Sequence, residues 1–538
     1  MKFFDRCFCW AARAVSLFFG LFFAASALVV FAFSAKWLLL NTPKLAIPVI
    51  VFGVLFLGAA VGFFLRFVLR RLDRWGQLKT VLFICGAAFL LRILTGLILS
   101  ALDYVMVSDY LYAHQAASGA INAIPAVPFD DYFLQRGAYI HFVNAAYWGH
   151  HIALMHVLTR VFGNAMFLND LLNAIADTCV VWLIMAVGEK MFRSRRTGVA
   201  AAVIYALFPT SIICCNWFSG EFLGIALLFG GTWCMLAVLT PWCGALPRNP
   251  AKCILLAMIA GLLLGASDMM KPVAILIFMS LFAFEVCGLF GSFPRSRVQW
   301  KAVLTNVVLI VLAACVTMIS TAGLKKSYKH YTGYSENPSG VSGALFVGLN
   351  PEYRGMYHKD LSEMAIQLAQ DFRGDPVKIN AVYRDALMKN MRRSWKKLPK
   401  MFVQKAVLIF GSESWAVDRI AGGLKESHPG FRQSVIGKLG YQWGNLYYGV
   451  ILCGVIAAFF FMLVRKRLSS EGILICLFII LGTCMQMVVE AQPRYRISFL
   501  NPFMVMAAAY GLRLLRRIVA YRISKRRSHR DVGHTPSV

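Results

Sequence analysis

The chain has 538 residues, of which 59% are hydrophobic, and its formal net charge is +30. In a soluble protein this charge would suggest nucleic-acid binding. Here the basic residues lie between long apolar runs, which is the positive-inside pattern of a multi-pass membrane protein. The composition therefore excludes a soluble globular fold, and nucleic acid is not an expected partner.

Apolar segments long enough to cross a bilayer as helices recur along the whole chain. We predict an all-α polytopic membrane fold with about twelve transmembrane helices. Their expected positions are 15–40, 45–69, 80–101, 168–188, 197–215, 220–240, 252–268, 272–291, 301–323, 446–464, 471–489 and 497–515. The first of them is expected to be a retained span, because it is too long for a signal peptide and another span follows at once.

The basic clusters predict the orientation of these spans. With the N-terminus in the cytoplasm, the clusters at 66–79, 190–196, 295–301 and 465–467 are all cytoplasmic. This arrangement requires that the short apolar segment 150–163 does not cross the membrane but lies at its outer interface. Two large loops, 101–167 and 324–445, are then extracytoplasmic.

These segments divide the chain into consecutive regions. The expected order is two additional N-terminal transmembrane helices (1–79), a membrane core (80–323) that includes the first outer loop, an extracytoplasmic region (324–445), C-terminal transmembrane helices (446–515) and a basic cytoplasmic tail (516–538). Within 378–405, nine cations stand against one acid, Asp385, and apolar residues recur at helical spacing. We expect a basic amphipathic helix that lies on an anionic membrane surface, so membrane lipids are expected partners.

Charged and aromatic residues gather at the predicted outer ends of the spans. Asp109 follows the third span, Glu221 lies in the turn after the fifth, and Lys271 follows the seventh. Glu490, Arg494 and Tyr495 follow the eleventh span. Each residue alone could be a helix cap or a solvated turn. Because all of them fall on one membrane face, we interpret them as the rim of one site.

The residue types suit the transfer of a group from a lipid phosphate. A carboxylate can act as general base toward a hydroxyl, while Lys and Arg stabilise a departing phosphate. The guanidinium fork matches phosphate geometry, whereas lysine acts as a point charge. The sequence contains neither a Walker motif nor a GxGxxG unit, so a pre-activated substrate or an ion gradient must supply the energy. We expect no cofactor.

A divalent metal site is an alternative interpretation of the first outer loop. Histidines and a pair of acids occur there, namely Asp130, Asp131, His141, His150, His151 and His156. No two of these histidines have a recognised zinc spacing, and interfacial helices also use histidine as an amphipathic residue. We therefore predict no metal.

At these residues the chain resembles the GT-C glycosyltransferases. The resemblance is to the polyprenyl-phosphate-sugar-dependent group, which includes protein O-mannosyltransferases and the lipid A aminoarabinose transferase. It rests on Ser108-Asp109-Tyr110-Leu111-Tyr112-Ala113, Ala146-Tyr147-Trp148, Val161-Phe162-Gly163, Leu207-Phe208-Pro209, Ser219-Gly220-Glu221, Gly261…Gly265…Lys271-Pro272, Gly348-Leu349-Asn350 and Glu490…Arg494-Tyr495. Two departures are the missing proline pair before the segment 150–163 and the two additional N-terminal spans.

The resemblance implies a GT-C-like helical fold and specific roles for several residues. It implies that Asp109 is the catalytic base and that Lys271 contacts the lipid phosphate. Independently of the resemblance, Glu221 is the next candidate for the base. The full set expected to bind substrate is Lys271, Arg494, Tyr495, Glu490, Asn350, Tyr112 and Arg136.

The leading hypothesis is a cell-membrane glycosyltransferase with its active site on the extracytoplasmic side. It would move a sugar from a polyprenyl-phosphate carrier to an acceptor that the sequence does not identify. The alternatives are a lipid or solute transporter, such as a flippase, and a lipid-linked polymer ligase. A transporter would place charges near the bilayer midplane. Arg92, inside the third span, favours the transporter, but most acids lie at outer ends.

Overall fold

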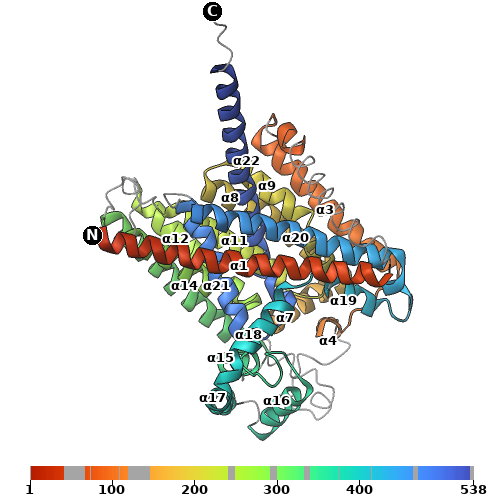
Figure 1. Ribbon diagram of the computed structural model, residues 1–538. Helices are drawn as coiled ribbons and strands as arrows, with labels where there is room; N and C mark the ends of the chain where they lie inside the picture. The colour runs from red at the N-terminus through yellow and green to blue at the C-terminus, as the bar shows by residue number, and fades with distance from the viewer. Residues whose placement is uncertain are drawn as a thin grey trace, which may run out of the picture.

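The computed structural model describes residues 2–41, 67–72, 74–107, 109–118, 146–239, 249–290, 300–332, 340–372, 375–413, 415–464 and 470–532. Within these residues the chain is helical and contains no strand, as predicted (Figure 1). The long helices in the first half are α1 (Lys2–Asn41), α3 (Gln77–Ala101), α8 (Ala165–Phe192), α11 (Glu221–Val238), α12 (Pro250–Met270), α13 (Ala274–Phe290) and α14 (Trp300–Thr332). Those in the second half are α20 (Val435–Val464), α21 (Ser470–Val488) and α22 (Leu500–Val532).

Eight of the described helices are long and apolar enough to cross a membrane. They are the Trp10–Ala32 part of α1, then α3, α8, α11 and α12, the Lys301–His330 part of α14, the Val435–Leu463 part of α20, and α21. Helix α13 has a shorter apolar segment, Ala274–Cys287. A multi-pass helical membrane protein is therefore confirmed, whereas the count of about twelve spans stays a prediction. Most of the expected span 45–69 lies outside the described residues.

The expected span 197–215 is not one continuous helix. It is divided into α9 (Arg195–Ala206) and α10 (Pro209–Cys214). The division follows from Pro209, which lacks an N–H and disfavours helical geometry at the preceding residue, and Phe208 is extended, with ψ 113°. The sequence prediction was wrong here because hydropathy alone does not register the proline.

Three groups of helices build the bundle. Helix α12 packs between α11 and α14, α20 packs between α1 and α22, and α8 packs against α3, α9 and α11. Glycines allow the closest of these approaches: a Cβ on Gly261 would lie 2.6 Å from Val316 Cβ and 2.7 Å from the Ala313 carbonyl oxygen of α14. The glycine face of α12 is thus in close contact with α14.

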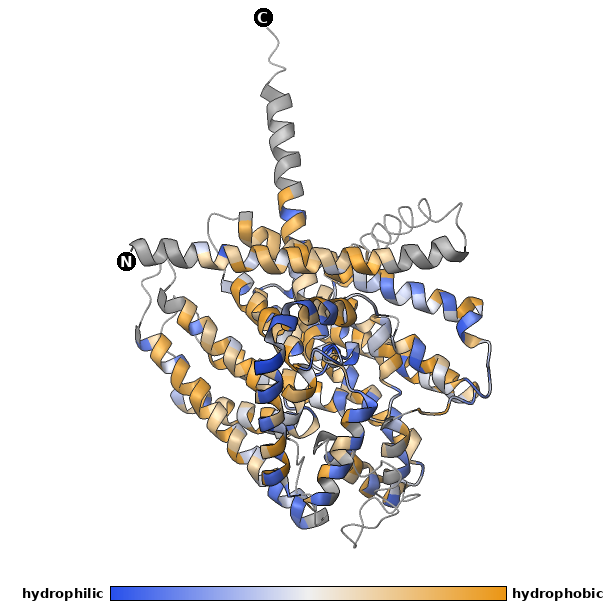
Figure 2. Cartoon of the chain, turned by 60° about the horizontal axis from the view of Figure 1, so that its bottom comes forward, coloured by the Kyte–Doolittle hydropathy of each residue, from blue (hydrophilic) through white to orange (hydrophobic). Residues whose placement is uncertain are grey.

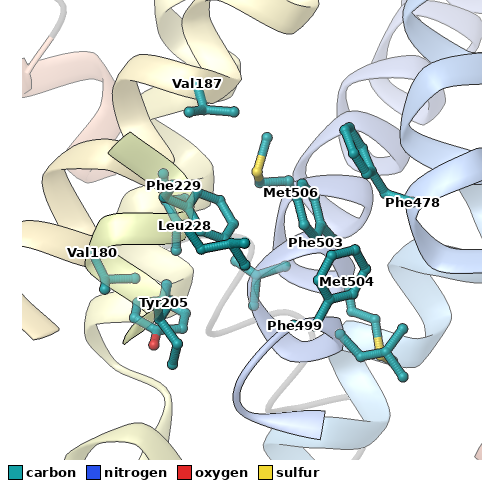
Figure 3. Packing of buried hydrophobic residues seen from close by; sticks show 14 of the residues in the cluster. Val180, Val187, Tyr205, Leu228, Phe229, Phe478, Phe499, Phe503, Met504 and Met506 are labelled. Atoms are coloured by element: carbon teal, nitrogen blue, oxygen red, sulfur yellow. The ribbon is translucent and has the colours of Figure 1, made fainter. Parts of the chain in front are cut away.

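The core of the bundle is aromatic where α11, α21 and α22 meet (Figure 3). The ring of Phe503 on α22 stacks on Phe478 of α21 with centroids 4.3 Å apart and on Phe229 of α11 with centroids 4.9 Å apart. All three side chains are fully buried. Offset stacking of this kind adds to the free energy that burial of the rings already supplies.

The ends of the helices separate into two groups. At one end, Arg195 donates to the Trp75 carbonyl, 2.9 Å, and Arg513 donates to the Phe192 carbonyl, 2.9 Å. These segments are the ones that charge predicted to be cytoplasmic. At the other end lie the starts of α4 (Asp109–Ala117) and α11 and the end of α12. The side of the membrane on which each group lies stays a prediction.

The region that follows α14 is a series of short helices. They are α15 (Gly340–Gly348), α16 (Lys359–Asp371), α17 (Pro376–Ser394), η1 (Trp395–Lys397), α18 (Leu398–Phe410), α19 (Trp415–Gly423) and η2 (Phe431–Gln433). Helices α15, α16 and α17 lie at the end of the molecule opposite to the C-terminal part of α22 (Figure 1). Figure 2 brings this end forward and shows hydrophilic residues gathered there, with largely apolar helices around them.

The basic amphipathic helix predicted at 378–405 is present but is arranged differently. It is divided between α17 and α18, with η1 between them and Pro399 in the first turn of α18. The apolar face of α17 is buried in a small core with α15 and α16, in which Ile379 and Tyr383 are 2% and 5% exposed. Ile379 and Tyr383 therefore pack on protein, whereas Met388 and Trp395 are 50% and 61% exposed. The cations of α17 are exposed, and the position of the segment on a membrane surface stays a prediction.

Candidate functional site

Two helix ends place Glu221 beside Lys271. Glu221 is the first residue of α11, and Lys271 directly follows the last turn of α12. A carboxylate at a helix N-terminus and a cation at a helix C-terminus both interact favourably with the helix dipole. Gly220 allows the approach, because a Cβ there would lie 2.7 Å from Met270 Sδ and 3.1 Å from His151 Cβ.

Lys271 and Glu221 form an ion pair. The Lys271 Nζ donates to Glu221 Oε1 at 2.7 Å, and the side chains are 11% and 6% exposed. Burial lowers the pKa of the Lys271 ammonium, and the neighbouring Glu221 carboxylate opposes that shift. The two residues that the sequence assigned to separate roles are therefore direct partners.

A second cation, Arg494, lies close to the same tyrosine ring as Lys271. The short helix η3 (Pro493–Arg496) carries Arg494 and Tyr495. The Lys271 Nζ lies 4.4 Å from the centroid of the Tyr495 ring, and the Arg494 Cζ lies 5.4 Å from it. Cations at these distances are attracted by the ring quadrupole, so one tyrosine holds two positive charges close together.

Arg494 also connects the site to α4. Its Nη1 donates to the Tyr110 hydroxyl at 3.2 Å, and its Cζ lies 5.7 Å from the centroid of the Tyr110 ring. The Tyr110 ring in turn packs on Trp217, with centroids 4.8 Å apart, and burial raises the pKa of its hydroxyl. We call Tyr110, Glu221, Lys271, Glu490, Arg494 and Tyr495 the polar cluster.

Glu490 completes the polar cluster from within its own loop. Its Oε2 accepts a hydrogen bond from the Tyr495 hydroxyl at 2.8 Å, and its Oε1 accepts one from Gln492. Both carboxylate oxygens thus have partners on the 490–495 segment. Glu490 orients the ring of Tyr495, on which Lys271 and Arg494 lie.

The other predicted site residues are placed less directly. Asp109 is the first residue of α4, next to the buried Tyr110, so its backbone adjoins the polar cluster. The side chains of Asp109 and Tyr112 and the whole of Arg136 lie outside what the structure describes. Asn350 accepts a hydrogen bond from the Glu352 N–H at 3.1 Å, which closes its own turn and does not involve the polar cluster.

Arg92, the residue that favoured a transporter, is part of a buried network between helices. Its Nε lies 2.5 Å from Asp177 Oδ2, and neither side chain is exposed. The Asp177 carboxylate also accepts from Tyr205, 2.9 Å, and Ser211, 2.6 Å. The network joins α3, α8, α9 and α10, so the charge is a fixed structural element. Asp177 was missed in the sequence, although an acid in the middle of a predicted span was the signal.

Arg496 forms a second buried pair close to the polar cluster. It donates to Glu413, and both side chains are fully buried. Its Cζ lies 4.4 Å from the centroid of the Tyr448 ring on α20. Of the two arginines in η3, Arg494 belongs to the polar cluster. Arg496 connects η3 to Glu413, in the segment that follows α18, and to Tyr448 of α20.

The described histidines of the first loop have packing roles. The His151 Nε2 lies 3.2 Å from Asn169 Oδ1, and the His156 Nδ1 lies 3.2 Å from the Ala117 carbonyl oxygen. Among the described residues, no three His, Cys, Asp or Glu side chains are grouped so that they could hold a metal ion. The remaining residues of that alternative, Asp130, Asp131 and His141, lie outside the described part.

Comparison with solved structures finds similar folds at low sequence identity. The archaeal oligosaccharyltransferase AglB from Archaeoglobus fulgidus, in complex with an inhibitory peptide and a dolichol-phosphate, is 13% identical with a TM-score of 0.45, over 84% of this chain and 52% of that chain. The apo form of the Archaeoglobus fulgidus enzyme gives 13% identity and a TM-score of 0.46 over 84% and 52%. ArnT from Cupriavidus metallidurans, bound to undecaprenyl phosphate, is 13% identical with a TM-score of 0.32, over 81% of this chain and 78% of that one.

The chain therefore spans about half the length of the archaeal oligosaccharyltransferase. No protein-family model matches the sequence, and comparison with curated proteins gives no match. The solved structures found include ArnT, an aminoarabinose transferase, which belongs to the group that the sequence motifs resemble. At this identity and these TM-scores the likeness decides neither the activity nor the substrate.

Proposed function

We propose that the chain is a membrane glycosyltransferase that takes its sugar from a polyprenyl-phosphate carrier and passes it to an extracytoplasmic acceptor. The observation that carries the proposal is the placement of two largely buried cations, Lys271 and Arg494, against one tyrosine ring at a common end of the helices. A phosphate that reaches this end from the bilayer would meet both of them.

Charge development during the reaction explains why two cations suit this site. In the donor, phosphate is a diester that carries one negative charge. When the bond between the anomeric carbon and the phosphate oxygen breaks, the phosphate leaves as a monoester with up to two charges. Cations fixed close to that oxygen stabilise the transition state more than the ground state, which is the requirement for catalysis.

The ion pair favours Asp109 over Glu221 as general base. Glu221 is engaged by Lys271 at 2.7 Å and would have to leave this partner to accept a proton. Asp109 adjoins the polar cluster at the start of α4. In the proposed reaction an acceptor hydroxyl attacks the anomeric carbon, Asp109 takes the hydroxyl proton, and the lipid phosphate departs toward Lys271 and Arg494.

Binding of a phosphate lipid tests the proposal without knowledge of the acceptor. The purified chain in nanodiscs is titrated with a long-chain polyprenyl phosphate and, as a ligand control, with the corresponding polyprenol. We expect Arg494→Gln and the double variant Glu221→Gln/Lys271→Gln to bind the phosphate on the order of 10–100-fold more weakly, because each loses a charge-assisted contact.

The double variant is used so that no buried Glu221 is left unpaired. Lys400→Gln, which removes an exposed cation of α18, is the matched control and should bind like the parent. Equal affinity of the parent for the phosphate and the polyprenol would contradict the proposal, as would unchanged affinity in both site variants.

A further inference from the structure

One lysine of the segment 378–405, which was predicted to lie on a membrane surface, is buried in the protein. Lys405 lies on α18 and is fully buried. Its Nζ donates to the Gly348 carbonyl oxygen at 2.8 Å and to the Val489 carbonyl oxygen. A lysine is seldom buried to this extent without a specific arrangement of partners. Its two partners lie far apart in the sequence.

The two carbonyls belong to two segments that are already in close contact. Gly348 ends α15, and a Cβ on it would lie 2.3 Å from the Val488 carbonyl oxygen, so only glycine permits this approach. The Ala491 N–H donates to the Gly355 carbonyl at 2.7 Å, and the Gly355 N–H donates to the Asn350 carbonyl at 2.9 Å. Lys405 therefore closes a junction between the 348–355 turn and the 488–491 segment.

The 488–491 segment leads directly into the polar cluster. Val489 precedes Glu490, whose carboxylate holds the Tyr495 hydroxyl. The Tyr495 ring is the surface on which Lys271 and Arg494 lie. Displacement of Val489 would thus move the group that orients both cations.

We infer that Lys405 is a positioning residue for the phosphate-binding cations: it fixes the start of the 490–495 segment against the 348–355 turn. The expected effect on phosphate binding rests on the proposed function, whereas the junction that Lys405 forms does not. It also gives Gly348-Leu349-Asn350 a role, since this motif supplies the turn that Lys405 fastens and makes no contact with the polar cluster through Asn350.

Hydrogen–deuterium exchange of the full chain in nanodiscs tests the junction directly. In Lys405→Met, which keeps the length of the side chain and removes its donors, peptides that contain the Gly355 and Ala491 amides should exchange at least about tenfold faster. Peptides from α8 and α11 should exchange as in the parent. Lys400→Met, on the same helix but exposed, should change neither set. Unchanged exchange at both amides, or an equal increase throughout the bundle, would overturn the inference.

Gly348→Ala provides a second route if Lys405→Met does not fold. It separates the two segments sterically while Lys405 is kept, and the same two amides should lose protection. The consequence for the site is measured as the ratio of polyprenyl phosphate affinity to polyprenol affinity. This ratio should fall about tenfold in either variant, with Lys271 and Arg494 intact.

The two measurements separate the possible failures. Faster exchange at the junction with an unchanged affinity ratio would overturn the positioning role. If the parent itself does not distinguish phosphate from polyprenol, the proposed function fails, while the exchange result still decides whether Lys405 holds the junction.

Discussion

At the scale of residues, burial separates two kinds of ion pair. Arg92 with Asp177 and Arg496 with Glu413 are completely inaccessible, and further hydrogen bonds hold each pair. Lys271 with Glu221 retains 11% and 6% exposure and lies beside a tyrosine ring that is shared with Arg494. The first two pairs are fixed parts of the scaffold. In the proposed reaction, the third pair exchanges a partner when the lipid phosphate binds.

The free energies of unfolding of single and double variants test whether Lys271 and Glu221 interact in the folded protein. Glu221→Gln or Lys271→Gln alone leaves one charge buried and should reduce the free energy of unfolding by about 3–5 kcal/mol. The double variant should lose clearly less than the sum of the two single variants, because no unpaired charge remains. Denaturant unfolding in detergent, followed by tryptophan fluorescence, measures all three. Additive losses would show that the residues do not interact.

The pH dependence of stability reports on Lys405. Burial lowers its pKa from 10.5 to about 8. Between about pH 8 and 10.5 the unfolded chain therefore binds more protons than the folded chain at this site, so this lysine makes stability rise with pH in that window. The rise should be absent from Lys405→Met when its unfolding free energies at pH 7.5 and 9.5 are compared with those of the parent. Identical pH profiles would contradict a lowered pKa.

The sequence analysis identified five of the six residues of the polar cluster, all but Tyr110, and did not identify their partners. Glu221, Lys271, Glu490, Arg494 and Tyr495 were found because charges at helix ends are recognisable from hydropathy. Their pairing depends on which helix ends meet, and Lys271 and Glu221 are 50 residues apart. Asp177 was overlooked although it lies within a predicted span, and its pairing with Arg92, 85 residues away, depends on the packing of α3 on α8.

At the scale of elements, helix positions predicted from length and hydropathy are accurate where neighbouring residues alone determine the helix. The break at Pro209 could have been predicted from proline geometry. The arrangement of the helices within 324–445 could not be predicted, because these helices are short and their burial depends on tertiary contacts. The amphipathic pattern of α17 was predicted correctly, but its contacts with α15 and α16 were not predicted.

Added volume on α12 tests the packing of that element. Gly261→Ala would place a Cβ 2.7 Å from the backbone oxygen of Ala313, which cannot move aside as a flexible side chain can. We expect a loss of about 1–3 kcal/mol from overpacking, seen as a lower midpoint in thermal unfolding.

Gly86→Ala on α3 is the matched control for that substitution. A Cβ at this position meets nothing within 4 Å, so the variant should be slightly more stable than the parent through helix propensity alone. If both variants shift the midpoint equally, the close α12–α14 contact is not formed.

At the scale of the whole molecule, the account requires that the polar cluster lies on the extracytoplasmic face. Accessibility tags inserted at residues 130 and 335, within the two predicted outer loops, should be labelled from outside intact cells. Tags at either terminus should be labelled only after permeabilisation, because the basic ends are retained inside. A cytoplasmic position for the tag at 335 would place the polar cluster, and every residue in it, on the wrong side for the proposed reaction.

The central claim is that sugar leaves a polyprenyl phosphate with Asp109 as general base. The most direct measurement is the rate of transfer from a radiolabelled polyprenyl-phosphate sugar in membranes that contain the native acceptors, with the parent and Asp109→Asn expressed equally. Asparagine keeps the shape and removes the basicity, so the account predicts transfer by the parent and a rate about 10²–10⁴-fold lower in the variant. Equal rates would contradict the role of Asp109, and no transfer by the parent would contradict the proposed reaction.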